Sequence, residues 1–264
     1  SSYSTIKYAK NTGKITSSST SSKNVGGIVG TAWTGSTILN CTNSSSTQMN
    51  ISGCESLGGI AGVALISTIQ NSTNSTSILG GNIVGGIVGF TQSSGISGSS
   101  NSGSVQGVSY IGGLAGQLTH STITGSGTNS GTITATGSKS YVGGIVGIIG
   151  EESGVSDTSY IQGTSSNYIT NTGAVYGMSN IGGIAGYVSN GAGYTWSLTN
   201  TTVAIEYATN SGTVYCNGNS NYGLPTNYTY TDTDNYSTTI YASASRVFAG
   251  GIAGESNSGI VNTI

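Results

Sequence analysis

The chain has 264 residues, of which only 5% are charged, against about a quarter in ordinary soluble proteins. Its formal net charge of −2 offers no basic surface for nucleic acid, so we expect no nucleic-acid partner. Glycine and serine interrupt every apolar stretch well short of the roughly 20 residues that a membrane-spanning helix needs, so we expect no membrane span.

Three short elements recur along the chain in a fixed order. The first reads STI at Ser4, and STI or SGI returns at Ser36, Ser94, Ser121 and Ser258. The second is an asparagine with glycine two residues later, as in NTGKI at Asn11. The third is VGGIVG at Val25, and hexapeptides of the same shape begin at Leu57, Val84, Ile111, Val142, Ile181 and Ala249. The minimal period is 27 residues, in the range that is typical of solenoids, propellers and other repeat arrays.

Three short β-type segments per period, each bounded by glycine or asparagine, indicate one coil of a solenoid. We therefore predict an all-β fold, a right-handed parallel β-solenoid of about seven coils with three short strands per coil. Residues 1–264 form a single domain in this interpretation, because each repeat contacts only its neighbours. Insertions are expected near 150–163, 190–200 and 217–246, the last of them long and rich in tyrosine.

The hexapeptide is interpreted as an inward-facing corner. Its first and fourth residues are apolar, for example Val25 and Ile28, and a straight strand would direct them to opposite faces. The Gly-Gly pair between them can adopt backbone angles closed to other residues, which would bring both side chains inward.

The asparagines are expected to stack above one another, about 4.8 Å apart, as a hydrogen-bonded ladder. Its predicted members are Asn11, Asn43, Asn74, Asn101, Asn129, Asn171 and Asn210. An apolar ladder is predicted beside it, formed by Ile15, Ile78, Val105, Ile133, Val175 and Val214.

These glycine-hydrophobic-glycine corners, in periods near thirty residues, resemble GLUG-type repeats over nearly the whole chain. Such repeats are found in large surface adhesins and around bacterial immunoglobulin A peptidases. The resemblance implies a β-solenoid in a cell-surface or extracellular setting. It does not extend to peptidase activity, because the sequence has no HExxH motif and His120 is its only histidine.

We expect no enzyme activity, cofactor or metal. His120 is interpreted as a turn or solvent-facing residue, since no acidic residue is near it in sequence. Glu151, Glu152 and Asp157 fall within one insertion, where a solvated loop is the first interpretation and a calcium or catalytic site the alternative. A polysaccharide lyase or hydrolase is less favoured, because it would need paired carboxylates or a cation site with basic partners.

The three cysteines leave two alternatives. Cys41 and Cys54 could close a short disulfide loop in an oxidising compartment, or these two and Cys216 are small buried thiols.

The longest insertion, 217–246, is expected either to contact a partner or to pack as a lid over the solenoid. Tyrosine among serine, glycine and asparagine is a composition typical of recognition surfaces. The candidate contact residues are Tyr222, Tyr228, Tyr230, Tyr236 and Tyr241. Asn227 and Asn235 are the candidate glycosylation sites if the source is eukaryotic.

The two ends of the predicted solenoid differ in charge and carry no obvious cap. The candidate assembly edges are Lys7, Lys10, Lys14 and Lys23 at one end and Glu255 and Ile260 at the other. Open edges invite pairing with further strands, so the expected partner is a second copy, stacked head to tail, or adjoining repeats of a longer chain. Alternatively, the lysines only protect an exposed edge.

The sequence thus favours an extracellular structural protein that forms a fibre, filament or stalk. The alternative is a cell-surface adhesin or carbohydrate-binding segment that contacts glycans or cell surfaces through the tyrosine-rich insertion.

Overall fold

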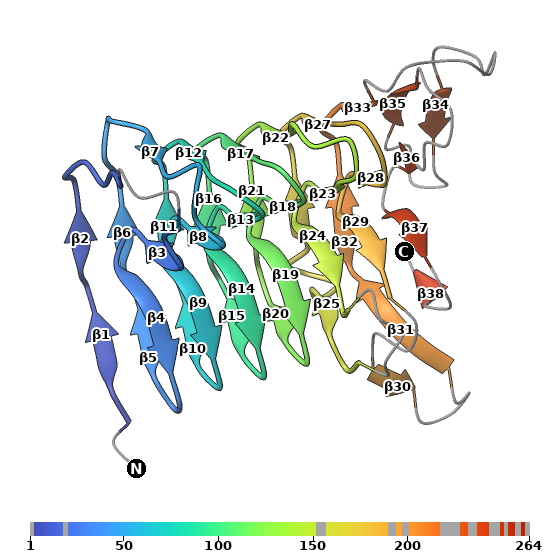
Figure 1. The fold of residues 1–264 in the computed structure, drawn as a ribbon. Coiled ribbons are helices and arrows are strands. Elements are labelled where there is room, and N and C mark those ends of the chain that lie inside the picture. Colours follow the sequence, from blue (N-terminus) through green and yellow to red (C-terminus); the bar gives the residue numbers. More distant parts are fainter. Residues whose placement is uncertain are drawn as a thin grey trace.

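The computed structural model describes residues 3–17, 21–151, 157–189, 194–196, 201–216, 228–231, 237–242, 249–250, 253–256 and 260–261. These residues form strands, turns and bends, and none of them is helical. The strands wind into a parallel β-solenoid whose coils follow one another in a row from the N-terminal to the C-terminal side (Figure 1). The predicted fold class is confirmed.

Five sheets run along the solenoid, named A to E in the order in which the chain visits them. Sheet A contains β1 (Thr5–Lys7), β5 (Thr37–Leu39), β10 (Thr68–Gln70), β15 (Gly95–Ser97), β20 (Thr122–Thr124), β25 (Tyr160–Gln162), β31 (Thr201–Glu206), β30 (Tyr194–Trp196) and β38 (Ile260–Val261). Sheet B contains β2 (Lys10–Asn11), β6 (Thr42–Asn43), β11 (Thr73–Asn74), β16 (Ser100–Asn101), β21 (Thr128–Asn129), β26 (Ile169–Asn171) and β32 (Ala208–Asn210).

The other three sheets complete each coil. Sheet C contains β7 (Met49–Asn50), β12 (Ile78–Leu79), β17 (Val105–Gly107), β22 (Ile133–Ala135), β27 (Val175–Gly177), β33 (Val214–Cys216), β35 (Ser237–Ala242) and β34 (Tyr228–Thr231). Sheet D contains β3 (Asn24–Gly26), β8 (Ser56–Gly58), β13 (Ile83–Gly85), β18 (Tyr110–Gly112), β23 (Tyr141–Gly143), β28 (Ile181–Gly182) and β36 (Ala249–Gly250). Sheet E contains β4 (Val29–Trp33), β9 (Ala61–Leu65), β14 (Val88–Gln92), β19 (Ala115–Thr119), β24 (Val146–Ile149), β29 (Ala185–Val188) and β37 (Ala253–Ser256).

Two details of the predicted coil were wrong. Each coil has five strands rather than three, because the asparagine segment divides into strands of sheets B and C and the hexapeptide divides into strands of sheets D and E. Six coils, from β5 to β37, carry a strand in every sheet, so complete coils are one fewer than the seven expected. In the first coil, sheet C is represented only by an isolated bridge between Thr16 and Asn50.

Residues in the left-handed backbone region mark two of the corners. Between sheets A and B this position is held by Asn40 (φ 55°) and Asn71 (φ 48°), and between sheets E and A by Ile66 (φ 49°) and His120 (φ 46°). Serines follow several of these residues and link the coils, as where the Ser94 N–H donates to the Ser121 hydroxyl at 3.0 Å. These corners have no constant residue type, which is why sequence inspection did not find them.

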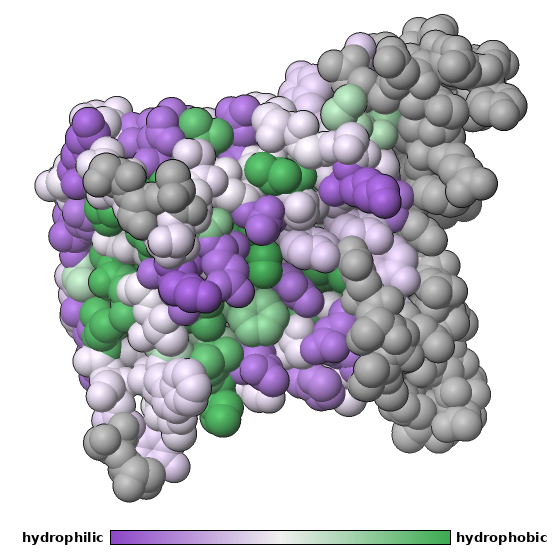
Figure 2. Space-filling view, in the orientation of Figure 1, coloured by the Kyte–Doolittle hydropathy of each residue, from purple (hydrophilic) through white to green (hydrophobic). Residues whose placement is uncertain are grey.

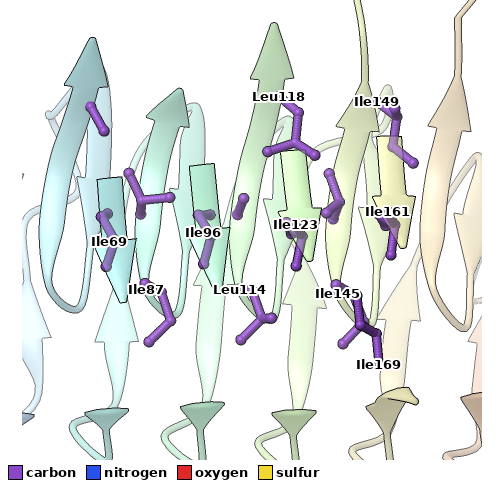
Figure 3. Packing of buried hydrophobic residues seen from close by; sticks show 14 of the residues in the cluster. Ile69, Ile87, Ile96, Leu114, Leu118, Ile123, Ile145, Ile149, Ile161 and Ile169 are labelled. Carbon is purple, nitrogen blue, oxygen red and sulfur yellow. The ribbon is translucent and has the colours of Figure 1, made fainter. Parts of the chain in front are cut away.

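Stacking in register produces columns of identical or similar residues. In sheet A, isoleucines pair from coil to coil, and Figure 3 shows Ile69, Ile96, Ile123 and Ile161 following one another. Each of these four is at most 1% exposed. Full burial of one such side chain contributes about 1.5–3 kcal/mol, so these columns are a main source of stability.

The buried side chains form two separate clusters. One joins sheets A and E with the fourth hexapeptide position, for example Ile60 and Ile87. The other joins sheets C and D with the first hexapeptide position, for example Leu57 and Val84. Both positions therefore face inward, as predicted, but each enters a different cluster.

The Gly-Gly pair is required for close packing rather than for unusual backbone angles. Positive φ occurs at Gly35, Gly98, Gly125 and Gly150 among the described glycines, none of which belongs to a hexapeptide. A Cβ atom on Gly86 would instead overlap the carbonyl oxygen of Gly113 and the side chain of Asn101. The expected reason for the glycines was therefore wrong, although their position at an inward corner was right.

We predict that Gly86→Ala destabilises the fold by about 3 kcal/mol, the upper end of the range for overpacking, because the added methyl group meets backbone that cannot move aside. Gly95→Ala is the matched control, since a Cβ atom there has nothing closer than the Thr122 hydroxyl at 3.7 Å. Urea unfolding followed by circular dichroism measures both. Equal stability of the two variants would contradict the packing explanation.

Candidate functional site

The seven ladder asparagines lie in a single column along the solenoid. In every step, Nδ2 of one asparagine donates to Oδ1 of the asparagine in the next coil. The six distances, from Asn11 to Asn210, are 2.9, 2.9, 2.8, 2.8, 2.8 and 2.7 Å. Asn11 is half-buried, and the other six are at most 4% exposed.

Six of the seven amides also close their own turn, and Asn43 Nδ2 instead donates to the Met49 sulfur at 3.4 Å. Nδ2 of Asn101 donates to the Gly103 carbonyl at 2.8 Å, and the same bond recurs from Asn129 to Gly131 at 2.9 Å. Both amide hydrogens therefore have an acceptor, which the burial of a polar group requires. Such a network holds each coil at one height relative to the next.

The column lies between the two apolar clusters. The second glycine of each corner packs against it, so a Cβ atom on Gly59 would overlap Asn74 and one on Gly113 would overlap Asn129. A polar wall of asparagine amides and glycine backbone thus runs through the interior. Asparagine and Gly-Gly recur together because the asparagine amide fills the space that the missing side chain of the second glycine leaves free.

The N-terminal edge exposes strand edges and apolar side chains together. Within the described residues no strand pairs with the outer edges of β1, β2, β3 and β4. A groove of about 500 Å³ opens there, and its lining includes Ile6, Val29, Ala32, Trp33 and Ile38. Figure 2 shows apolar surface at this end of the molecule, around β1 and β4.

All four predicted edge lysines, Lys7, Lys10, Lys14 and Lys23, are exposed in the first coil. Lys23 lies 3.4 Å from the Glu55 carboxylate, but both side chains are more than half exposed. Such a surface pair contributes only about 0–1 kcal/mol.

The C-terminal side differs from the expected open edge. Ile260 lies in β38, which pairs with β31, and Glu255 lies in β37, where its Cα partner is Tyr187. β30 also pairs with β31, in the antiparallel direction. In sheet C, β35 pairs with β33 and β34 pairs with β35. Sheet A therefore continues into the parallel strand β38, whereas sheet C ends in the antiparallel strand β34.

The tyrosine-rich insertion is described in part. Tyr228 and Tyr230 lie in β34, and Tyr241 lies in β35 opposite Tyr215. Tyr222, Tyr236, Asn227 and Asn235 lie outside the described residues.

His120 and Asp157, which sequence reasoning treated separately, lie together. The Asp157 carboxylate, 1% exposed, accepts the His120 main-chain N–H through both oxygens at 3.1 Å and the Ser159 N–H at 2.6 Å. His120 Nδ1 lies 3.6 Å from Oδ2. The solvated-loop interpretation was wrong for Asp157, Glu151 is half-buried, and Glu152 lies outside the described residues.

The position of Asp157 gives it a structural role. In the preceding coils the corresponding N–H groups, those of Ile66 and Ser93, donate to main-chain oxygens of the next coil at 2.9 and 3.0 Å. The insertion after Gly150 interrupts this pattern, and the Asp157 carboxylate supplies the acceptor in its place.

All three cysteines are free and buried, so the second of the two alternatives holds and Cys41 is not joined to Cys54. Burial raises the pKa of the Cys54 thiol, which disfavours the reactive thiolate.

Neither a cluster of metal ligands nor a membrane-spanning helix occurs among the described residues. No three His, Cys, Asp or Glu side chains gather there as a metal site would require. The same residues contain no helix long and apolar enough to cross a membrane.

These features define a β-solenoid repeat protein built around an asparagine column. Residues 21–47 match the family model described as the GLUG motif, which confirms the resemblance seen in the sequence. The matched segment spans one complete hexapeptide corner together with β5 and β6. Neither the curated proteins nor the solved structures contain a match to this chain.

We predict that Asn101→Ala lowers stability by about 3 kcal/mol, because one buried Nδ2 hydrogen of Asn74 loses its acceptor and Asn129 Oδ1 keeps only the Gly131 N–H at 3.3 Å. Ser102→Ala, at the exposed neighbouring position, is the control and should change stability by less than about 0.5 kcal/mol. Thermal unfolding compares the two. An Asn101→Ala protein as stable as the control would show that the column is dispensable.

We also predict that Asp157→Ala destabilises the protein by about 1–3 kcal/mol, because the buried Ser159 N–H and the partly buried His120 N–H lose their acceptor. Asp157→Asn retains one carbonyl oxygen and should lose less. Chemical denaturation of both variants tests the order. Unchanged stability in Asp157→Ala would remove the structural role and reopen the catalytic or calcium-site interpretation.

Proposed function

We propose that this chain is a non-enzymatic structural element of an extracellular or cell-surface protein, a stalk whose N-terminal edge joins another coil of the same kind. The observation that carries the proposal is the unbroken asparagine column, which ends at an edge with unpaired strands within the described residues. A rod built in this way gains stability from each added coil, because neighbouring repeats stabilise one another.

The composition of the described residues supports a structural rather than a catalytic role. The interior contains aliphatic columns and fully bonded amides, and the buried Asp157 carboxylate is occupied by main-chain N–H groups. Glu206, 4% exposed, accepts a hydrogen bond from Gln162 Nε2 at 2.9 Å. Neither carboxylate is presented to solvent as a glycan-cleaving pair would be.

A stalk is favoured over a fibre of identical stacked copies. Head-to-tail stacking needs open parallel edges at both ends, whereas the C-terminal edge of sheet C already ends in the antiparallel strand β34. Adjoining repeats of a longer protein are therefore the favoured partners of the N-terminal edge.

Antibodies against the purified chain test the surface location. We expect them to label intact source cells as strongly as permeabilised ones, with a cytoplasmic protein as the control that is labelled only after permeabilisation. Labelling that requires permeabilisation would exclude a surface stalk.

A second candidate function, glycan or cell-surface binding, is favoured by the tyrosines of sheet C. The rings of Tyr176 and Tyr215 have centroids 5.7 Å apart, and Tyr241 follows in register. Tyrosine rings of this kind supply amphipathic contact area. Glycan-array binding that is lost in Tyr176→Ala and kept in Gly95→Ala would establish this function, and no binding by the wild-type chain would remove it.

A further inference from the structure

The two ends of the solenoid differ in what they offer to another coil. At the N-terminal end, the outer edges of β1 to β4 have no strand beside them within the described residues. At the C-terminal end, sheet C is extended by strands that lie outside the repeat, as the place of β34 and β35 beyond β33 shows (Figure 1).

We propose that the hairpin β34–β35 is a cap that prevents stacking at the C-terminal end, and that the N-terminal edge binds an uncapped C-terminal solenoid coil. The partner to which we commit is a second copy of this chain from which the hairpin cap has been removed. This rests on the proposed function, because it uses the same open N-terminal edge.

The hairpin occupies the place of the next coil in sheet C. β35 is parallel to β33 and pairs Val214 with Ile240, Tyr215 with Tyr241 and Cys216 with Ala242. This continues the parallel order of the preceding coils. β35 thus substitutes for one further rung of the sheet.

The strand that follows in the sheet runs in the wrong direction for a solenoid. β34 is antiparallel to β35, with Tyr228 opposite Ile240 and Thr231 opposite Ser237. A further coil would have to run parallel in all five sheets at once. Reversal of one edge strand therefore stops the stacking of coils, as edge protection in natural sheets does.

Sheet A is not closed in this way. β38 is parallel to β31 and pairs Ile260 with Val203, so it continues the order of the coils. β30 is antiparallel to β31, but it pairs with Val203 on the side opposite β38, which is the side of the earlier coils. The reversed edge strand is therefore found in sheet C.

The N-terminal edge has the chemistry that a parallel coil requires. Each column asparagine donates toward the C-terminal coils, so Asn11 presents its Oδ1 atom at the start of the column. That oxygen accepts the Gly13 N–H at 3.0 Å and has a second lone pair for an incoming amide. Ile6 and Val29, both partly exposed beside the groove, can be covered by the apolar residues of the same coil.

The direction of the column also fixes the orientation of the partner. An incoming coil must present an Nδ2 donor to Asn11. In this chain the Nδ2 atom of each column asparagine points toward the following, C-terminal coil, so a C-terminal end supplies that donor. Head-to-tail contact satisfies this requirement, and contact between two N-terminal ends does not. Assembly at this edge is therefore directional.

The test uses an uncapped variant in which residues 217–248 are replaced by Met-Ser-Asn. This tripeptide, residues 178–180, joins the equivalent strands β27 and β28 one coil earlier, and Gly177 and Ile181 pair with Cys216 and Ala249. The new connection therefore has a length that the solenoid already accepts.

We expect the wild-type chain to show no end-to-end assembly in light scattering and electron microscopy, and the uncapped variant to form chains of rods. Adding Ile6→Lys to the uncapped variant should abolish this self-assembly, because a charge then lies at the accepting groove. That double variant, mixed with wild-type protein, should give a complex of about twice the monomer mass. In that mixture the only contact left open joins the N-terminal edge of the wild-type chain to the uncapped C-terminal end of the double variant.

Wild-type protein that forms filaments, or a folded uncapped variant that stays monomeric, would overturn the proposal. If circular dichroism shows that the replacement does not fold, the point variant Ile240→Pro, which removes one N–H of β35, is assayed in its place with the same expected and overturning results. If the uncapped variant does not stack but antibodies label intact cells, the cap is rejected and the proposed surface stalk stands. If the uncapped variant stacks but labelling requires permeabilisation, only the surface location is rejected.

Discussion

The fold depends on a column of buried amides at a fixed position in every coil. An asparagine side chain can donate and accept along one line, so six hydrogen bonds of 2.7–2.9 Å connect seven successive coils through the interior. Breaking one step leaves a donor and an acceptor buried, which costs more than the bond itself contributes. The register of the neighbouring strands is therefore fixed from within.

The Gly-Gly corner follows from this constraint. The amides need space where the chain turns from sheet D to sheet E, and any side chain at Gly59 or Gly86 would fill it. The adjoining apolar residues are then divided between two clusters, one on each side of the polar wall. Low charge, frequent glycine and few large side chains are consequences of this narrow cross-section.

Much of this architecture can be predicted from sequence, because residues that recur once per coil are visible as a pattern. The asparagine positions and the inward-facing corners belong to that class. The five-strand coil was missed, since the corners at Asn40 and Ile66 depend on backbone angles shared by dissimilar residues. Asp157 and His120, 37 residues apart, meet only through coil stacking, and the pairing of β34 and β35 lies outside the repeat.

Exchange of the asparagine side-chain amides measured by nuclear magnetic resonance tests the column most directly. The Nδ2 hydrogens of Asn74, Asn101 and Asn129 should exchange as slowly as the main-chain N–H groups of the buried strands, whereas those of the exposed Asn82 should exchange rapidly. Column amides that exchange at the rate of Asn82 would contradict the account, because the bonds that fix the coils would then be absent or open in solution.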